Sequence, residues 1–237
     1  MSRTVWTAAT VAAAAAFLLT GCGQGQPGAD RTEEREVAGV SAVLLTTDGR
    51  LVVEQGEQTS LTVTAGQRVL PHLTSEVHDG VLTLDVDEPL GPNWHDGIEY
   101  RLVVPRLDAV SLDGSGDVEG DGLATGDALA VTVKGSGTLH LGAVDVDDLT
   151  VVLAGSGDVE LTGRAERADI TLPGSGSYLG NELATSTAAV TLDGSGRVDL
   201  DVSEELTVVL SGSGVVSHTG GAEVTSDVDG SGQVVAR

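Results

Sequence analysis

Apolar and polar residues alternate along much of the chain, and from residue 111 onward this alternation is arranged around a recurring Gly-Ser-Gly triplet. The position two residues before the triplet is apolar in all seven copies: Leu112, Val133, Leu153, Leu172, Leu192, Leu210 and Val228. The position two residues after it is apolar as well: Val118, Leu139, Val159, Tyr178, Val198, Val216 and Val234. A period of two is typical of a β-strand with one buried face, so the sequence predicts a strand on each side of every triplet.

The triplets recur at a nearly constant spacing. Their serines are residues 115, 136, 156, 175, 195, 213 and 231, which gives repeats of 18 to 21 residues. Such a period is typical of stacked repeat proteins, in which each coil buries its apolar face against its neighbours. Coils of this length with two or three short strands predict an all-β fold, a parallel β-helix-like solenoid. A β-propeller blade needs about 40 residues and a leucine-rich repeat carries an asparagine ladder, so both fit less well.

Glycine is expected at the corners because it adopts positive φ without penalty and allows successive corners to stack closely. We expect the serine between the glycines to hydrogen-bond the local backbone or its copy in the next coil. A catalytic role for these serines is disfavoured, because seven equivalent nucleophiles serve no chemical purpose. The triplet also lacks the Gly-x-Ser-x-Gly pattern of a nucleophile elbow.

The segment before residue 111 is less regular but also predicts strands. Asp48-Gly49 marks a tight turn between two short strands, and His78-Asp79-Gly80 precedes an alternating strand at residues 81–86. We expect this segment to cover the edge of the first coil. At the other end, residues 233–237 are expected to leave a backbone edge exposed, which invites self-association or pairing with a partner strand.

The first residues have the features of an export signal. Arg3 precedes an apolar run over residues 5–19, which is short for a membrane-spanning helix. The sequence Leu19-Thr20-Gly21-Cys22 resembles the lipobox of bacterial lipoproteins, in which the cysteine carries a diacylglycerol and begins the mature chain. A plain secretory signal followed by a chance cysteine is the alternative.

These observations divide the chain into three parts. We predict a lipoprotein signal peptide at residues 1–21, with lipid attachment at Cys22. A flexible tether follows at residues 22–35, because this stretch has few apolar residues to bury. The β domain covers residues 36–237, with an N-terminal β part at 36–110 and the seven Gly-Ser-Gly repeats at 111–237.

Charge and composition narrow the classes of partner. The chain has 12 Lys and Arg against 36 Asp and Glu, a net charge of -24, which argues against nucleic acid or a bare anionic bilayer as the main partner. Cys22 is the only cysteine, so no intramolecular disulfide forms. Aromatic residues make up 2% of the chain, so the core must consist of aliphatic side chains.

Several polar residues are candidates for ligand binding. Carboxylates beside the triplets have the oxygen ligands that calcium prefers: Asp113, Asp117, Asp158, Asp193 and Asp229. However, the residue before the triplet is acidic in only three of seven copies, which favours solvated surface charge. His78 and His95 lie in turn sequences and lack the spacing of a zinc site. Trp94 has either a packing role or contacts a sugar or a protein, and packing is favoured. We predict no catalytic residue, metal or cofactor.

Three stretches resemble a known family. They are residues 36–43 (EVAGVSAV), residues 51–57 (LVVEQGE), and residues 104–110 (VPRLDAV) leading into 113–118 (DGSGDV). Together they resemble the putative auto-transporter adhesin, head GIN domain family over roughly residues 36–237. The resemblance implies an extracytoplasmic β-helical domain whose biochemical role is largely unestablished. We expect the lipid on Cys22 to replace the membrane barrel of a true autotransporter as the anchor.

The sequence therefore predicts a non-enzymatic cell-envelope protein, anchored to the cell membrane by acylated Cys22 and facing the extracytoplasmic side. Its β-helical domain would serve in surface interaction or adhesion, or in a structural role. The expected partners are membrane lipid and an unidentified extracytoplasmic protein or glycan. The alternative is a carbohydrate-binding or polysaccharide-cleaving β-helix, which would need clustered carboxylates with basic partners and aromatic platforms.

Overall fold

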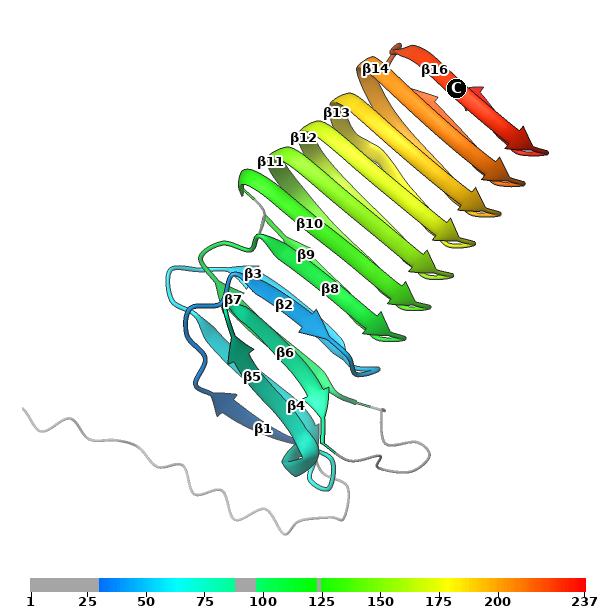
Figure 1. The fold of residues 1–237 in the computed structure, drawn as a ribbon. Coiled ribbons are helices and arrows are strands. Elements are labelled where there is room, and N and C mark those ends of the chain that lie inside the picture. The colour runs from blue at the N-terminus through cyan, green and yellow to red at the C-terminus, as the bar shows by residue number, and fades with distance from the viewer. Residues whose placement is uncertain (1–29, 88–96, 123–124) are drawn as a thin grey trace, which may run out of the picture.

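The computed structural model describes residues 30–87, 97–122 and 125–237, and these residues form a β-solenoid (Figure 1). The N-terminal part contains β1 (Asp30–Arg35), β2 (Ala42–Leu45), β3 (Arg50–Gln55), β4 (Ser60–Gly66), a short 3₁₀ helix η1 (Leu70–His72), β5 (Leu73–His78), β6 (Val81–Val86) and β7 (Glu99–Val104). The predicted signal peptide, Cys22, Trp94 and His95 lie outside the described residues.

The repeat part consists of strands that follow one another around the coils. They are β8 (Ala109–Gly114), β9 (Asp117–Asp121), β10 (Thr125–Gly135), β11 (Thr138–Gly155), β12 (Asp158–Gly174), β13 (Ser177–Gly194), β14 (Arg197–Gly212), β15 (Val215–Thr219), β16 (Glu223–Gly230) and β17 (Gln233–Ala236). Each strand pairs in parallel with its copy one coil away, as Val131 does with Val110 on one side and Val151 on the other. The predicted parallel solenoid is confirmed.

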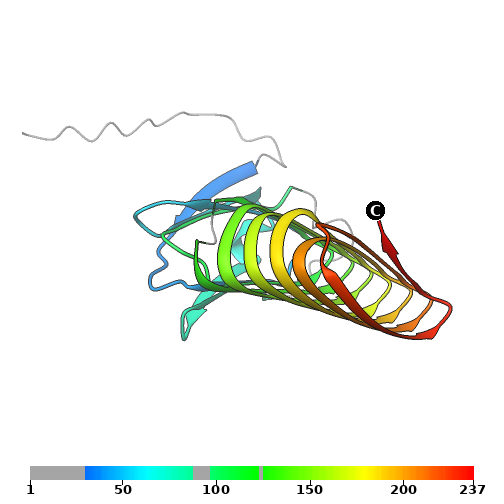
Figure 2. The same cartoon turned by 90° about the horizontal axis from the view of Figure 1, so that it is seen from above.

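Each coil has two sides joined by a Gly-Ser-Gly corner. We call the side that leads into the triplet the entry side; it contains β8, β10, the last residues of β11–β14, and β16. The exit side leaves the triplet and contains β9, the first residues of β11–β14, β15 and β17. Figure 2 shows these two sides along the axis, connected at the far end by a curved return.

The corners are held together by backbone hydrogen bonds between successive coils. The amide of Ser136 donates to the carbonyl of Gly114 at 3.0 Å, and the amide of Ser156 donates to that of Gly135 at 2.8 Å. The pattern continues to Ser231, whose amide donates to Gly212 at 2.8 Å. Contrary to expectation, the serine hydroxyls of the triplets are exposed and make no hydrogen bond among the described residues. The backbone of the corner, not the hydroxyl, links the coils.

The core lies between the two sides and is almost entirely aliphatic. Leu112, Leu153 and Leu172 from the entry side are fully buried, as the period of two predicts. The two buried tyrosines are Tyr100 in β7 and Tyr178 on the exit side, where the ring of Tyr178 replaces an aliphatic side chain. Gly180 makes room for it, because a Cβ at Gly180 would lie 2.7 Å from the phenolic oxygen of Tyr178.

The curved return takes the place of a third short strand, which the sequence allowed for in each coil. β11 runs without interruption from Thr138 to Gly155, and β12, β13 and β14 behave in the same way. The strand register shifts within this stretch, for example between Leu141 and Val144. Bulges of this kind bend a strand, so one long strand can turn the corner without a loop.

The N-terminal part covers the first coil, as expected, but its order in space differs from its order in the chain. β6 pairs in parallel with β2, and β7 pairs in parallel with β3, so the coil β6–β7 lies at the outer edge of the coil β2–β3. The Asp48-Gly49 turn joins β2 to β3 as a coil corner, since these two strands pair with neighbouring coils. Three antiparallel pairs then close the edge: β5 with β6, β4 with β7, and β1 with β4.

β1 departs from the prediction of a flexible tether through residue 35. All of its register partners lie on β4, from Asp30 opposite Gly66 to Arg35 opposite Leu61. Arg35 also reaches across the end of the solenoid, where its Nη1 donates to the carbonyl of Leu73 at 2.6 Å. The other side chains of β1 are exposed and polar, so hydrophobic patterning gave no signal for this strand.

Candidate interaction surfaces

The entry side of β8 and β10–β14 has few charges at its three outward positions nearest the triplet, which lie one, three and five residues before it. The charged residues at these positions are Asp113, Lys134, Asp169 and Asp193. The remaining positions of this set hold Ala, Ser, Thr, Val or Pro. We call this surface the entry face. Its scarcity of charge contrasts with the net charge of -24 of the whole chain.

The curved return carries acidic residues that pair with arginines on the next coil. Asp145 lies directly opposite Arg164, with 2.7 Å between carboxylate and guanidinium, and Asp148 lies opposite Arg167 at the same distance. The hydrogen bond from Arg164 to Asp145 and the charge of that carboxylate raise the pKa of the guanidinium. Exposed pairs of this kind contribute little to stability, typically less than about 1 kcal/mol each.

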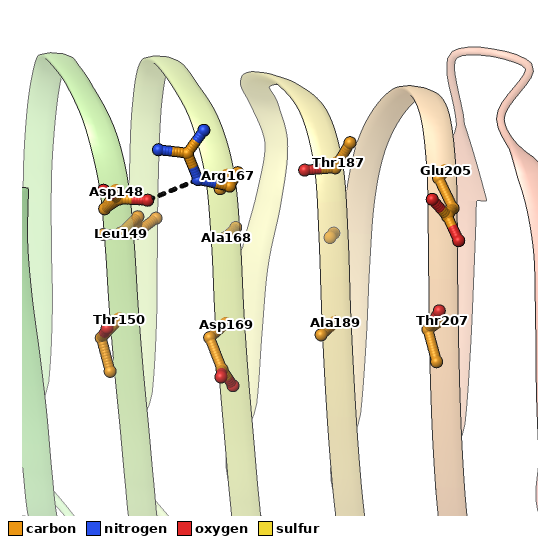
Figure 3. Close-up of a pocket in the computed structure, with 11 residues that line it drawn as sticks. Asp148, Leu149, Thr150, Arg167, Ala168, Asp169, Thr187, Ala189, Glu205 and Thr207 are labelled. Atoms are coloured by element: carbon orange, nitrogen blue, oxygen red, sulfur yellow. Dashed lines mark hydrogen bonds and ion pairs between the residues drawn. The ribbon is translucent and has the colours of Figure 1, made fainter.

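A depression of about 380 Å³ lies where the curved return meets the entry face (Figure 3). Two columns of outward side chains border it: Asp148, Arg167, Thr187 and Glu205 in one, and Thr150, Asp169, Ala189 and Thr207 in the other. Figure 3 shows Arg167 turned toward Asp148. Glu205, two coils further along the same column, has no ion pair among the described residues. The depression has hydroxyls and carboxylates that can hydrogen-bond a polar ligand.

A second depression, of about 760 Å³, lies on the exit side. Glu54, Glu119, Asp121 and His140 contribute its polar groups, and no aromatic residue lines it. Glu54 is paired with Arg101 and Glu119 with Arg50. The usual glycosidase needs two carboxyl groups available as acid and as base or nucleophile, and the arginines occupy two of the carboxylates here.

The C-terminal end of the exit side contains buried polar groups. Asp199 is 6% exposed and lies 2.7 Å from Arg197 and 3.4 Å from Arg237. His218 occupies an inward position between Leu200 and Ala236 on the neighbouring coils. It is 9% exposed, and its Nδ1 has no hydrogen-bond partner in the described part of the chain.

The acidic residues considered for calcium do not come together. Asp117 and Asp158 are separated by Thr138 in the same column, and Asp193 and Asp229 by Ser211. Asp113 lies in the column of Asp193, with Lys134 next to it. Within residues 30–87, 97–122 and 125–237, no group of three or more His, Cys, Asp or Glu is arranged to hold a metal ion.

The histidines of the N-terminal part have separate surroundings. His72 lies 3.1 Å from Asp87, and exposed His78 lies 3.5 Å from Glu76.

Sequence reasoning missed the entry face and the Asp–Arg columns. The polar residue between each pair of apolar ones contains this information, but it becomes visible only when the coils are aligned in their true register.

The parallel coils, the packed aliphatic core and the extended outer surfaces define a β-solenoid. The chain belongs to the family described as putative auto-transporter adhesin, head GIN domain, which matches residues 41–222 and confirms the resemblance. An adhesin-like family of this kind consists of proteins that face the outside of the cell. A comparison with curated proteins found no match.

Solved structures share the fold of this chain. A putative adhesin from Bacteroides fragilis has a TM-score of 0.84 and 22% identity, over 88% of this chain and 97% of that one. A putative lipid binding protein from Parabacteroides distasonis has a TM-score of 0.69 and 19% identity, over 88% and 96%. A putative adhesin from Parabacteroides merdae has the same TM-score and coverage at 18% identity. Among the residues the structure describes, no helix has the length and apolar character of a membrane span.

Proposed function

We propose that the protein is a non-enzymatic, lipid-anchored cell-envelope protein whose solenoid binds an extracytoplasmic protein or glycan through its entry face. The observation that supports this most is the scarcity of charge on that face in a strongly acidic molecule. Depletion of charged residues is the compositional signal of the centre of a protein interface. The rigid coils hold this surface flat, so a partner binds without ordering a loop.

The proposed anchor is a lipid on Cys22, in the sequence Leu19-Thr20-Gly21-Cys22. Each buried acyl methylene contributes about 0.8 kcal/mol, so several chains on one residue hold a protein at a bilayer without a spanning helix. Cys22→Ser is expected to abolish labelling by a fatty acid and to move the protein from the membrane fraction to the soluble fraction. Continued fatty-acid labelling of the Cys22→Ser protein would contradict the anchor.

The role of the entry face is tested by attachment of cells that display the full chain. Thr150→Glu, Thr171→Glu and Ala189→Glu together place three charges on the entry face. Ser136→Glu, Ser156→Glu and Ser175→Glu place three charges on exposed corner residues and form the matched control. We expect the first variant to reduce attachment to other cells or to envelope material, and the control to retain it. Equal attachment by both variants would overturn the proposal.

The alternative, a carbohydrate-binding or polysaccharide-cleaving protein, has its best support in the depression on the exit side. Asp121 is the carboxylate there that no arginine pairs with, and His140 lies 3.3 Å from the carboxylate of Glu160. Release of reducing ends from a polysaccharide by the purified protein, lost in Asp121→Asn, would favour this alternative over the entry face.

A further inference from the structure

The two ends of the solenoid differ. The N-terminal end is closed by antiparallel β1, β4 and β5. At the C-terminal end, β16 pairs with β14 and β17 pairs with β15, and no strand among the described residues lies beyond them. A strand with a partner on one side leaves alternate backbone N–H and C=O groups free to pair with another segment.

The inward side chains of β16 are also incompletely covered. Val224 and Val228 lie above the buried residues Leu206 and Leu210 of β14. Val228 remains 41% exposed, although its counterparts in the earlier coils are fully buried. One further strand with apolar residues at the matching positions would bury this surface.

The outward side chains of β16 are acidic. Glu223, Asp227 and Asp229 make no ion pair in the described part of the chain. On the curved return, two aspartates have an arginine directly opposite on the next coil: Asp145 has Arg164, and Asp148 has Arg167. By the same cross-strand rule, these carboxylates are complementary to a strand with basic outward residues.

We propose that β16 binds an extended segment of another protein in which apolar residues alternate with Lys or Arg. The segment adds one strand to the entry side: its backbone pairs with β16, its apolar residues cover Val224 and Val228, and its basic residues lie beside Glu223, Asp227 and Asp229. This inference rests on the proposed role in surface interaction and names the chemistry of one partner. Strand addition of this kind draws affinity from the main chain and specificity from alternate side chains.

A second copy of the chain is a poorer occupant, although self-association through this end was one of the two expectations from sequence, beside pairing with a partner strand. Pairing of two β16 strands brings two sets of the same three carboxylates to one interface. Like charges across a strand pair are destabilising, and edge charges are a common means of preventing self-pairing. A segment with basic residues removes this repulsion.

The test uses the full chain and a fluorescent peptide of alternating lysine and valine, with binding followed by anisotropy. We expect saturable binding, weakened by added salt, and slower amide exchange within residues 223–230. Asp227→Asn with Asp229→Asn should weaken binding about tenfold, given up to about 1 kcal/mol for each pair. The matched control is Asp113→Asn with Asp193→Asn, which removes two charges from the column of Asp229 in interior coils and should leave affinity unchanged.

Several results would overturn the inference. These are no binding, equal binding of a peptide with its lysines grouped together, equal weakening by the control variant, or dimerisation of the full chain through β16. Loss of peptide binding with normal cell attachment would reject this partner alone. If the entry-face variant and the corner variant attach to cells equally well, the proposed function is rejected, whereas the peptide-binding result is unaffected.

Discussion

At the scale of single residues, the corner depends on the two glycines and not on the serine between them. Gly135 has φ of +113°, and a Cβ there would lie 2.3 Å from the carbonyl oxygen of Gly114. The neighbouring Ser136 has its hydroxyl in solvent. We expect Gly135→Ala to lower the free energy of unfolding by about 2–4 kcal/mol, from backbone strain and displacement of the adjacent corner.

The control for Gly135→Ala is Ser136→Ala, which should change the free energy of unfolding by less than about 0.5 kcal/mol. Denaturant unfolding followed by circular dichroism measures both. Similar losses in the two variants would show that the serine hydroxyl contributes to the corner after all. The sequence predicted the glycines correctly because the same corner recurs in every coil and is visible as a repeated triplet. It did not settle the serine, because a hydroxyl has several partners available to it.

Tyr178 gives a prediction about pH at the same scale. Burial raises the pKa of its phenol above the ordinary value of 10.0, because the charged form has no solvation in the core. The neutral phenol is therefore favoured in the fold, and the unfolded chain loses its proton first as the pH rises. Stability is unaffected well below pH 10 and falls as the pH increases above it.

Tyr178→Phe tests this directly. The phenolic oxygen of Tyr178 is buried with no hydrogen-bond partner in the described residues. Its removal should raise the free energy of unfolding at neutral pH by about 1 kcal/mol and reduce the loss of stability above pH 10. Midpoints of denaturant unfolding at neutral and alkaline pH give both quantities. An unchanged alkaline slope in Tyr178→Phe would show that Tyr178 is not its cause.

At the scale of elements, Arg35 connects β1 to the rest of the N-terminal cap. Its guanidinium donates to the carbonyl of Leu73 at 2.6 Å, to the hydroxyl of Ser75 at 2.9 Å and to the carbonyl of Leu70 at 3.2 Å. Arg35→Met retains the apolar stem but leaves these acceptors unpaired. We expect a loss of about 1–3 kcal/mol, with faster amide exchange in β5 and unchanged exchange in β11–β13.

Exposed Arg31 on the same strand provides the matched control, because Arg31→Met removes the same charge without breaking these hydrogen bonds.

The cap also shows the limit of sequence patterning. The strands of β6 and β7 follow from alternation, but their place at the outer edge of the earlier coil β2–β3 does not. Register between distant strands depends on which pairings bury the most surface, and one sequence window contains no such comparison.

At the scale of the whole molecule, the sequence predicted the solenoid because the same local solution is repeated in coil after coil. Entry-side and exit-side strands follow from the period of two, and their stacking follows from the constant spacing of the triplets. The columns of the entry face lie at fixed distances before each triplet, so alignment of the triplets defines them as well. The Asp–Arg columns of the curved return could not be predicted in the same way, because the register shifts there and the spacing of the triplets does not give the pairing.

Because each coil contacts mainly the coils above and below it, the molecule should tolerate the loss of one coil. Deletion of residues 155–173 joins Ala154 to Gly174, which pairs with Gly194 as the equivalent corner of the stack. In the shortened chain, the first residues of β13, on the exit side, pair with the first residues of β11. On the entry side, Val190 and Leu192 of β13 lie next to Val151 and Leu153 of β11. We expect a folded, cooperative protein that is shorter by about 4.8 Å along its axis, measured by small-angle scattering and circular dichroism.

A matched deletion of residues 155–164, about half a coil, should not fold, since it places entry-side residues opposite exit-side residues. Equal folding of both deletions would contradict stacking in a fixed register.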